Sequence, residues 1–110
     1  MIILNIDDYI LISNEYYDIN LILEIEAIYG KNILYMVYPY ESEYKIRAIN
    51  ISSNNFDLKK PLNKKWRGKK DKELEILCDG GVFVHSTGFI GSNKTKEGAI
   101  KMCRESYFSE

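Results

Sequence analysis

The residues most able to do chemistry lie in one stretch, from Gly80 to Thr95. This stretch contains four of the seven glycines and the only histidine, His85. Its order reads as a short β-rich run, a glycine-rich turn and a helix that opens with Lys94 and Thr95. Backbone N–H groups and the positive end of a helix dipole then gather around one point, an arrangement that commonly holds phosphate. The sequence therefore predicts an anion site here.

The entrance to this helix differs by one residue from a P-loop. Residues 88–95 follow the pattern G-x-x-x-x-G-K-[ST], except that Asn93 stands where the second glycine belongs. Asn tolerates a positive φ better than most residues, but it does not replace glycine where the backbone must approach phosphate. No acidic strand end is available to hold magnesium. The pattern favours a non-catalytic phosphate cradle, with mononucleotide binding as an alternative.

Charge is distributed unevenly along the chain. Residues 1–58 contain three basic and nine acidic residues, whereas residues 59–110 contain twelve basic and seven acidic ones. Eight of those twelve lie between Lys59 and Lys72, around Trp66 and Arg67. Such a segment is either a solvated lysine-rich loop or a basic surface for a polyanionic partner. In the second case Arg67 would present its guanidinium to a phosphate, and Trp66 would anchor the loop in the core or stack on a base.

His85 also has two interpretations. A lone histidine at the end of an apolar strand is often a core residue, and the alternative is a contact to substrate. No second His or Cys and no carboxylate pair at ligand spacing accompanies it, so it is not expected to bind a metal. Ser86 and Thr87 follow it directly, but neighbours on a strand point to opposite faces, so a serine hydrolase site is not expected either. Cys78 and Cys103 are expected to be reduced thiols of an intracellular protein.

The composition is typical of a single globular domain over residues 1–110. The chain is 45% hydrophobic and 28% charged, and its 110 residues are enough for a core of its own. No apolar run approaches the roughly 20 residues needed to span a bilayer. Asp7 and Asp8 interrupt any signal peptide. No membrane partner is expected.

Hydrophobic patterning predicts a mixture of strands and helices. Strands are expected over 2–6, 33–38, 44–51 and 82–85, and helices over 16–29, over 70–77 and from Thr95 onward. Residues 9–13 extend the first strand or begin a loop, 39–43 is turn-like, and 52–65 is a connection. There is no strict βαβ repeat. The expected fold class is a small α+β domain with a mixed sheet and a helical layer.

Two helices carry more detailed predictions. The first is expected to be capped by Asn14 and ended by Gly30, with Ile28 and Tyr29 on its apolar face. In the last helix the apolar positions recur at i, i+3, i+4 and i+7. These positions are Ala99, Met102, Cys103 and Ser106.

Residues 66–103 resemble a known family. The matching stretches are Trp66-Arg67-Gly68, Asp71, Glu73-Leu74 and the run from Val82 to Ala99. They look like the C-terminal signature of the melanocyte-proliferating-gene family, also called the metal-dependent protein hydrolase family, which is related to the DHH phosphoesterases. The match is looser over residues 33–51 and weakest before residue 30.

The resemblance implies a two-domain enzyme whose C-terminal, substrate-binding portion corresponds to this chain. Relatives carry an N-terminal DHH-like domain in which His and Asp residues bind two divalent metals, manganese or magnesium. Some relatives are described as 3′-to-5′ RNA exonucleases. With one histidine this chain cannot supply such a site. We therefore expect it to bind no cofactor itself and to be inactive alone, as a piece of a longer protein or a stand-alone remnant.

The resemblance also implies which residues and partners are involved. Gly80-Gly81, His85 and Gly88-Phe89 look like a spaced-out version of the G-G-G-H motif with which DHH relatives hold substrate. The expected substrate- or phosphate-binding residues are Trp66, Arg67, Gly80, Gly81, His85, Ser86, Gly88, Gly91, Asn93, Lys94 and Thr95. The expected partners are RNA or another phosphodiester and the DHH-like domain. The alternative is a stand-alone non-catalytic module that binds protein, phosphate or a nucleotide, or that forms homo-oligomers.

Overall fold

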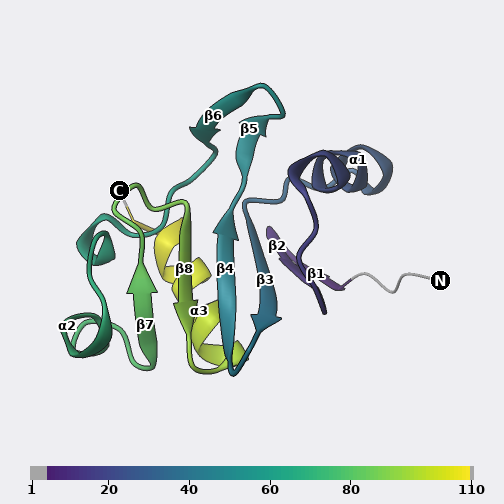
Figure 1. Ribbon diagram of the computed structural model, residues 1–110. Coiled ribbons are helices and arrows are strands. Elements are labelled where there is room, and N and C mark those ends of the chain that lie inside the picture. The colour runs from purple at the N-terminus through teal and green to yellow at the C-terminus, as the bar shows by residue number, and fades with distance from the viewer. Residues whose placement is uncertain (1–4, 110) are drawn as a thin grey trace.

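A mixed six-stranded sheet forms the centre of the computed structural model, which describes residues 5–109. Its strand order is β1-β2-β3-β4-β8-β7, and a separate two-stranded sheet, β5-β6, extends from the end of β4 (Figure 1). The strands are β1 (Asn5–Asp7), β2 (Ile10–Ile12), β3 (Tyr35–Tyr40), β4 (Glu43–Ala48), β5 (Asn50–Ser52), β6 (Asn55–Leu58), β7 (Gly81–Val84) and β8 (Ile90–Asn93). The helices are α1 (Ile19–Tyr29), the 3-10 helix η1 (Lys64–Trp66), α2 (Asp71–Glu75) and α3 (Lys96–Tyr107). The predicted α+β class is confirmed.

The sheet is mixed because one crossover joins parallel strands. β2 and β3 are parallel and are linked through α1, whereas the other neighbouring strands of this sheet are antiparallel. A parallel pair needs such a crossover, while antiparallel strands can be joined by short turns. The two segments 33–38 and 44–51, predicted as strands on either side of a turn, form the antiparallel β3–β4 hairpin.

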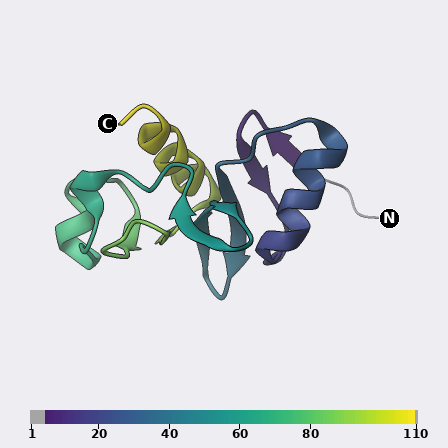
Figure 2. The ribbon, with the colours of Figure 1, turned by 90° about the horizontal axis from the view of Figure 1, so that it is seen from above.

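The helices α1 and α3 pack on opposite faces of the sheet (Figure 2). Alternate residues of β3 divide between two cores, as the two-residue period of a strand requires. One core contains Tyr35 and Val37 with Ala99 and Met102 of α3. The other contains Met36 and Tyr38 with Ile22 and Ile25 of α1. A strand buried on both faces explains the continuous apolar run in this segment.

One part of the sheet has a face without a helix on it. In Figure 1, α3 lies behind β4 and β8, and among the described residues no helix crosses in front of β4, β8 and β7. The pairing Lys45↔Ser92 and Phe83↔Ser92 places these side chains on that face. Arg47 shares it, because Arg47 lies two residues after Lys45 on the same strand.

The first helix differs from its prediction at both ends. It begins at Ile19, and Asp18 caps it by accepting from the amides of Asn20 at 2.6 Å and Leu21 at 3.3 Å. Asn14 is therefore not the cap, because the chain between it and Asp18 is not helical. Gly30 ends the helix as predicted, with φ 64°. Ile28 and Tyr29 are exposed, whereas Ile22 and Ile25 of this helix are buried and Ile19 and Leu21 pack against the same core.

The N-terminal segment and the expected connection both contain hairpins. Residues 9–13 neither extend the first strand nor form a loop; they contain β2, which turns back on β1 at Asp8, where φ is 57°. The part of the predicted strand before residue 5 lies outside the described residues. Within 52–65, Ser53 and Asn54 are the turn of the β5–β6 hairpin. The polar residues read as a linker are therefore turn residues.

The largest difference concerns residues 90–93. They were predicted to belong to a glycine-rich turn, and they form β8, which lies between β4 and β7. Gly91 marks a close approach of neighbours and not a turn, because a Cβ there would lie 3.0 Å from both the Leu62 side chain and the Phe83 carbonyl oxygen. The last helix is as predicted. Its four predicted positions are buried: Ala99, Met102, Cys103 and Ser106. No helix of the described residues is long and apolar enough to cross a bilayer.

Candidate functional site

The predicted site residues fall at two opposite ends of the β7–β8 hairpin. The strands pair with Gly81 opposite Asn93 and Val84 opposite Gly91. His85 and Gly88 therefore lie at one end, and Asn93 with the start of α3 lies at the other. A strand rises about 3.3 Å per residue, so the ends are roughly 15 Å apart. The structure thus brings Arg67, His85, Ser86 and Gly88 together, and it separates them from Lys94 and Thr95.

The Asn93 end is built around a buried side chain. Asn93 Nδ2 donates to the Asp79 carbonyl oxygen at 3.0 Å, and Asn93 Oδ1 accepts from the Thr95 amide at 3.0 Å. A Cβ at Gly80 would lie 2.6 Å from Asn93 Oδ1, and a Cβ at Gly81 would lie 2.8 Å from the Leu74 side chain. The glycines at this end therefore make room for neighbouring side chains.

Several backbone amides at the entrance of α3 already donate within the protein. Lys94 N donates to the Gly80 carbonyl oxygen at 2.9 Å, and Gly98 N donates to Oγ1 of the capping residue Thr95 at 2.9 Å. Lys94 Nζ lies 2.8 Å from Glu75 Oε2, and this hydrogen bond lowers the pKa of the Glu75 carboxyl. A phosphate here would have to displace these partners. Because residues 90–93 are a strand, residues 88–95 do not form a P-loop.

The opposite end joins Arg67 to the turn between β7 and β8. Gly88 has φ 77°, and its carbonyl oxygen accepts from Leu62 N at 2.9 Å. Arg67 Nε donates to the Leu62 carbonyl oxygen at 2.9 Å. A Cβ at Gly88 would lie 2.9 Å from Arg67 Nε. Glycine is therefore required twice at this position, by the left-handed backbone and by the arginine packed against it.

His85 is exposed in the same turn and is not a core residue. The Thr87 amide donates to His85 Nδ1 at 3.2 Å, and Thr87 Oγ1 lies 3.0 Å from the same nitrogen. A nitrogen that accepts from an amide carries no proton, so the proton of the neutral ring is on Nε2, which is left to donate outward. Ser86 is also exposed in this turn.

Trp66 anchors the loop beside the turn between β7 and β8, but its ring is not available to contact a ligand. The side chain is only 3% exposed and belongs to the core under α3. Of the two interpretations, anchoring the loop is the one that the geometry allows, because a buried ring cannot stack on a base. The anchored loop continues into Gly68, whose amide donates to the Val84 carbonyl oxygen at 2.9 Å.

Arg47 belongs to the same region and was missed in the sequence. Its guanidinium carbon lies 5.1 Å from the centroid of the Phe89 ring. The His85 ring contacts the same Phe89 ring edge to face, with 4.7 Å between the centroids. Both contacts are within the range of favourable cation–π and aromatic pairs. Arg47 Nη2 donates to Asn50 Oδ1 at 3.0 Å, and Nη1 donates to the Ala48 carbonyl oxygen. The alternation of Lys45 and Arg47 with the buried Ile46 was the signal that could have placed this arginine on the open face.

The arginines differ in how their charge is balanced. Arg104 lies 2.5 Å from Asp7 and 3.6 Å from Asp8. Within residues 5–109, neither Arg47 nor Arg67 forms an ion pair, and both donate to neutral oxygens. Two uncompensated guanidinium groups therefore flank one turn. We call Arg47, Arg67, His85, Thr87 and Phe89 the arginine–aromatic cluster.

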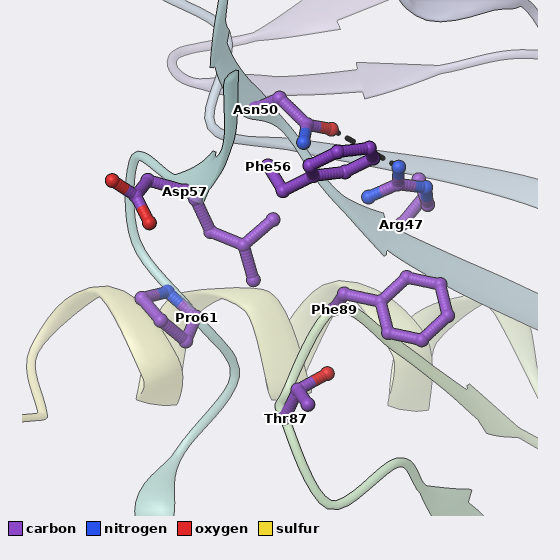
Figure 3. A pocket seen from close by; sticks show the side chains of 8 residues that line it. Arg47, Asn50, Phe56, Asp57, Pro61, Thr87 and Phe89 are labelled. Atoms are coloured by element: carbon purple, nitrogen blue, oxygen red, sulfur yellow. Dashed lines mark hydrogen bonds between the residues drawn. The ribbon is translucent and has the colours of Figure 1, made fainter.

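A cleft of about 550 Å³ opens beside this cluster (Figure 3). Thr87 and Phe89 form one wall, Arg47 and Asn50 lie at the back, and Phe56 comes from the β5–β6 hairpin. The volume lies within the range usual for sites that bind small ligands. Asp57 also borders the cleft, and its carboxylate points away from Arg47 in Figure 3.

No metal-ligand cluster is present in the part of the chain that the structure describes. No group of three or more His, Cys, Asp or Glu side chains could hold a metal ion there. The two cysteines are buried and unpaired with each other. The cluster combines guanidinium groups with aromatic rings, which suits it to binding an anion with attached aromatic groups.

Comparison with known proteins gives a consistent group of relatives. The family model MYG1_exonuc, described as an uncharacterised protein family (UPF0160), matches residues 3–107. A MYG1 protein of Schizosaccharomyces pombe is 34% identical over 105 residues, which cover 94% of this chain and 31% of the relative. A MYG1 protein of Dictyostelium discoideum is 45% identical over 62 residues, covering 54% of this chain and 19% of the relative. The human MYG1 exonuclease is 33% identical over 75 residues, covering 66% of this chain and 20% of the relative.

The chain thus spans between 19 and 31% of the length of these relatives. No solved structure matches it.

Proposed function

This chain belongs to the family of the MYG1 proteins, and from that premise we propose that it is a substrate-binding domain that holds the phosphodiester backbone of RNA. The relatives from mammals carry the name exonuclease. The observation that carries the proposal is the pair of arginines, Arg47 and Arg67, near the exposed His85. Within residues 5–109 neither arginine has a carboxylate partner. The guanidinium fork can bind a phosphate through two parallel hydrogen bonds.

The proposed division of labour follows from what this chain can supply. Hydrolysis by a metal-activated water needs a ligand set, and residues 5–109 provide none. We assign the metal, manganese or magnesium, to a DHH-like domain of the longer relatives. In this chain Arg67 and the Nε2–H of His85 donate to non-bridging phosphate oxygens. Held in this way, the scissile bond is positioned and its developing charge is stabilised.

The entrance of α3 has a smaller part in this proposal. The glycines Gly80, Gly81 and Gly91 and the buried Asn93 shape the hairpin that presents the turn. Lys94 and Thr95 would at most contact a neighbouring phosphate along the strand, since roughly 15 Å separates them from Gly88. Successive phosphates of an extended strand are several ångströms apart, so two contacts of one chain of RNA are compatible with this spacing.

The experiment is a titration of fluorescently labelled single-stranded RNA with the 110-residue chain at several salt concentrations. We expect affinity to fall linearly with the logarithm of the salt concentration. Arg67→Met should weaken binding about tenfold and reduce the salt slope by about one. Arg104→Met is the matched control, because Arg104 is already paired with Asp7 and Asp8. Equal losses in both variants would contradict the proposal.

A second measurement tests the division of labour. RNA incubated with this chain and manganese should remain uncut. Cleavage by the chain alone, abolished by His85→Ala, would show that the catalytic group lies here and would overturn the assignment to another domain.

A protein-docking module is the second candidate, because a second surface is apolar. Ile76 and Leu77 after α2 and Phe108 after α3 are large exposed side chains, and Leu77 and Phe108 border a common cleft. Exposed apolar residues around one cleft are typical of protein contacts. Light scattering separates the candidates: a concentration-dependent increase in mass that Phe108→Ala abolishes would favour an interaction module.

A further inference from the structure

The cleft beside the arginine–aromatic cluster has a use that phosphate binding does not explain. Its walls are largely apolar and come from Phe56, Leu58, Pro61 and Phe89. A site for phosphate alone needs donors and charge and gains nothing from aromatic walls. Arg47 lies at the back of the cleft, with its guanidinium over the Phe89 ring.

The side chain of Phe56 is the most informative wall. It is 96% exposed, on a two-stranded hairpin that stands away from the main sheet (Figure 1). A phenylalanine in this position contributes almost nothing to the core, and its ring lies at the edge of a cleft (Figure 3). Flat aromatic surfaces beside basic groups are how single-stranded nucleic acids are held through their bases.

The amide at the back of the cleft is already hydrogen-bonded within the protein. Asn50 Oδ1 accepts from Arg47 at 3.0 Å, and Asn50 Nδ2 donates to the Asn55 carbonyl oxygen at 3.0 Å. The Asn50 amide is therefore held in place at both its oxygen and its nitrogen. Discrimination between bases requires free donors and acceptors at the base edge, whereas stacking tolerates every base.

We propose that this cleft binds one nucleobase of a single-stranded nucleic acid by stacking on Phe56 and Phe89, next to the phosphate held by Arg67, with little preference among the four bases. The inference rests on the proposed function, because a base enters the cleft only on a strand whose backbone lies on the cluster. Trp66 is buried and cannot serve as this platform. The uncompensated charge of Arg47 at the back of the cleft selects a nucleotide over a neutral apolar ligand.

The test compares two single strands of twelve nucleotides that carry equal numbers of phosphates. One is ordinary single-stranded RNA and the other is its abasic counterpart, and each is titrated with the 110-residue chain. We expect the base-bearing strand to bind about five- to thirty-fold more tightly, as stacking of one base on an aromatic ring predicts. Homopolymers of the four bases should bind within about fivefold of one another, since stacking is tolerant of sequence.

Two substitutions locate the effect. Phe56→Ala should bring the ratio of the two affinities close to one and leave the salt slope unchanged. Because the Phe56 side chain is 96% exposed, this variant is expected to keep the melting temperature of the parent chain. Phe108→Ala is the matched control, since that ring is 81% exposed and lies at the end of α3. Phe89→Leu provides a second removal of an aromatic wall.

The outcomes separate this inference from the proposed function. If both strands bind equally and with a steep salt dependence, the backbone site stands and the stacking subsite is overturned; a cleft that docks a protein segment gives this result. If Phe56→Ala and Phe108→Ala change the ratio equally, the base does not lie in this cleft. If neither strand binds at low salt, the proposed function and the subsite both fail.

Discussion

Asn93 Oδ1 lies 2.6 Å from the point that a Cβ of Gly80 would occupy. The carboxamide thus fills the space between the turn before β7 and the start of α3, and it hydrogen-bonds to both. In the sequence the same asparagine is the one mismatch to a P-loop. Its position shows why: the side chain connects two segments of the fold, and a glycine would leave this space empty.

Asn93→Gly is therefore predicted to complete the P-loop pattern and to destabilise the protein. The variant loses two hydrogen bonds of about 1 kcal/mol each, leaves the Asp79 carbonyl and the Thr95 amide without these partners, and places a flexible residue in a central strand. We expect the free energy of unfolding to fall by about 2–4 kcal/mol. Urea denaturation measures it.

The same variant tests nucleotide binding at the α3 entrance. ATP with magnesium should not raise its melting temperature. Lys94→Ala is the control, because it removes only an exposed ion pair with Glu75 and should cost less than about 1 kcal/mol. A stable Asn93→Gly protein that ATP stabilises would restore the P-loop interpretation.

Gly88→Ala is predicted to affect both stability and binding. The residue has φ 77°, and a Cβ would lie 2.9 Å from Arg67 Nε and 3.1 Å from Leu62 N. The strain of the backbone costs about 1–2 kcal/mol, and the clash should bring the loss to about 2–4 kcal/mol while displacing Arg67. RNA affinity should fall along with stability.

Gly68→Ala separates the two causes of that loss. Gly68 has φ 79°, but a Cβ there would have nothing within 4 Å. This variant should lose only about 1–2 kcal/mol and keep its affinity for RNA. Equal destabilisation in the two variants would mean that the contact between Gly88 and Arg67 is unimportant.

The elements that could be predicted from the sequence are those whose signals are local. The period of α3 depends on its own residues, and Gly30 ends α1 through its own backbone. The buried run of β3 was equally clear, because two cores enclose it. In these cases neighbours in the sequence are also neighbours in the structure.

The errors arose where the role of a residue depends on a contact with a residue far away in the sequence. Gly91 was interpreted as a turn residue, but glycine is needed there because the Leu62 side chain packs over β8. Among the predicted site residues, Arg67, His85 and Gly88 lie in one region of the structure. The site prediction joined them to Lys94 because a strand was read as a loop, and it omitted Arg47 because the stacking partner, Phe89, lies on another part of the chain.

The stability of the protein is predicted to fall at alkaline pH because of a buried thiol. Burial raises the pKa of Cys103 above its ordinary value of 9.0. Below pH 9 the folded and unfolded states both hold the proton; above pH 9 the unfolded chain releases it and the folded state keeps it. The free energy of unfolding should therefore decrease as the pH rises, by at most about 1.4 kcal/mol per pH unit for this group. Burial likewise raises the pKa of Cys78 to about 11, so the loss of stability caused by this thiol occurs between pH 9 and 11.

Urea denaturation between pH 7 and 10.5 measures this slope. Cys103→Ala lowers stability at every pH through the lost packing, and the informative quantity is its shallower decrease above pH 9. Parallel curves for the variant and the parent chain would show that Cys103 ionises equally in both states.

Arg47 provides a prediction that distinguishes charge from shape. Arg47→Met removes the charge and should reduce the salt slope of RNA binding by about one. Arg47→Lys keeps the charge but loses the planar group that lies over Phe89 and donates to Asn50. We expect the lysine variant to keep the parent salt slope and to bind about fivefold more weakly, a loss near 1 kcal/mol. Arg104→Lys is the control, because an exposed ion pair with Asp7 tolerates either cation and should leave the affinity unchanged. If Arg47→Lys binds as tightly as the parent chain, the stacked geometry is irrelevant and Arg47 acts only as a charge.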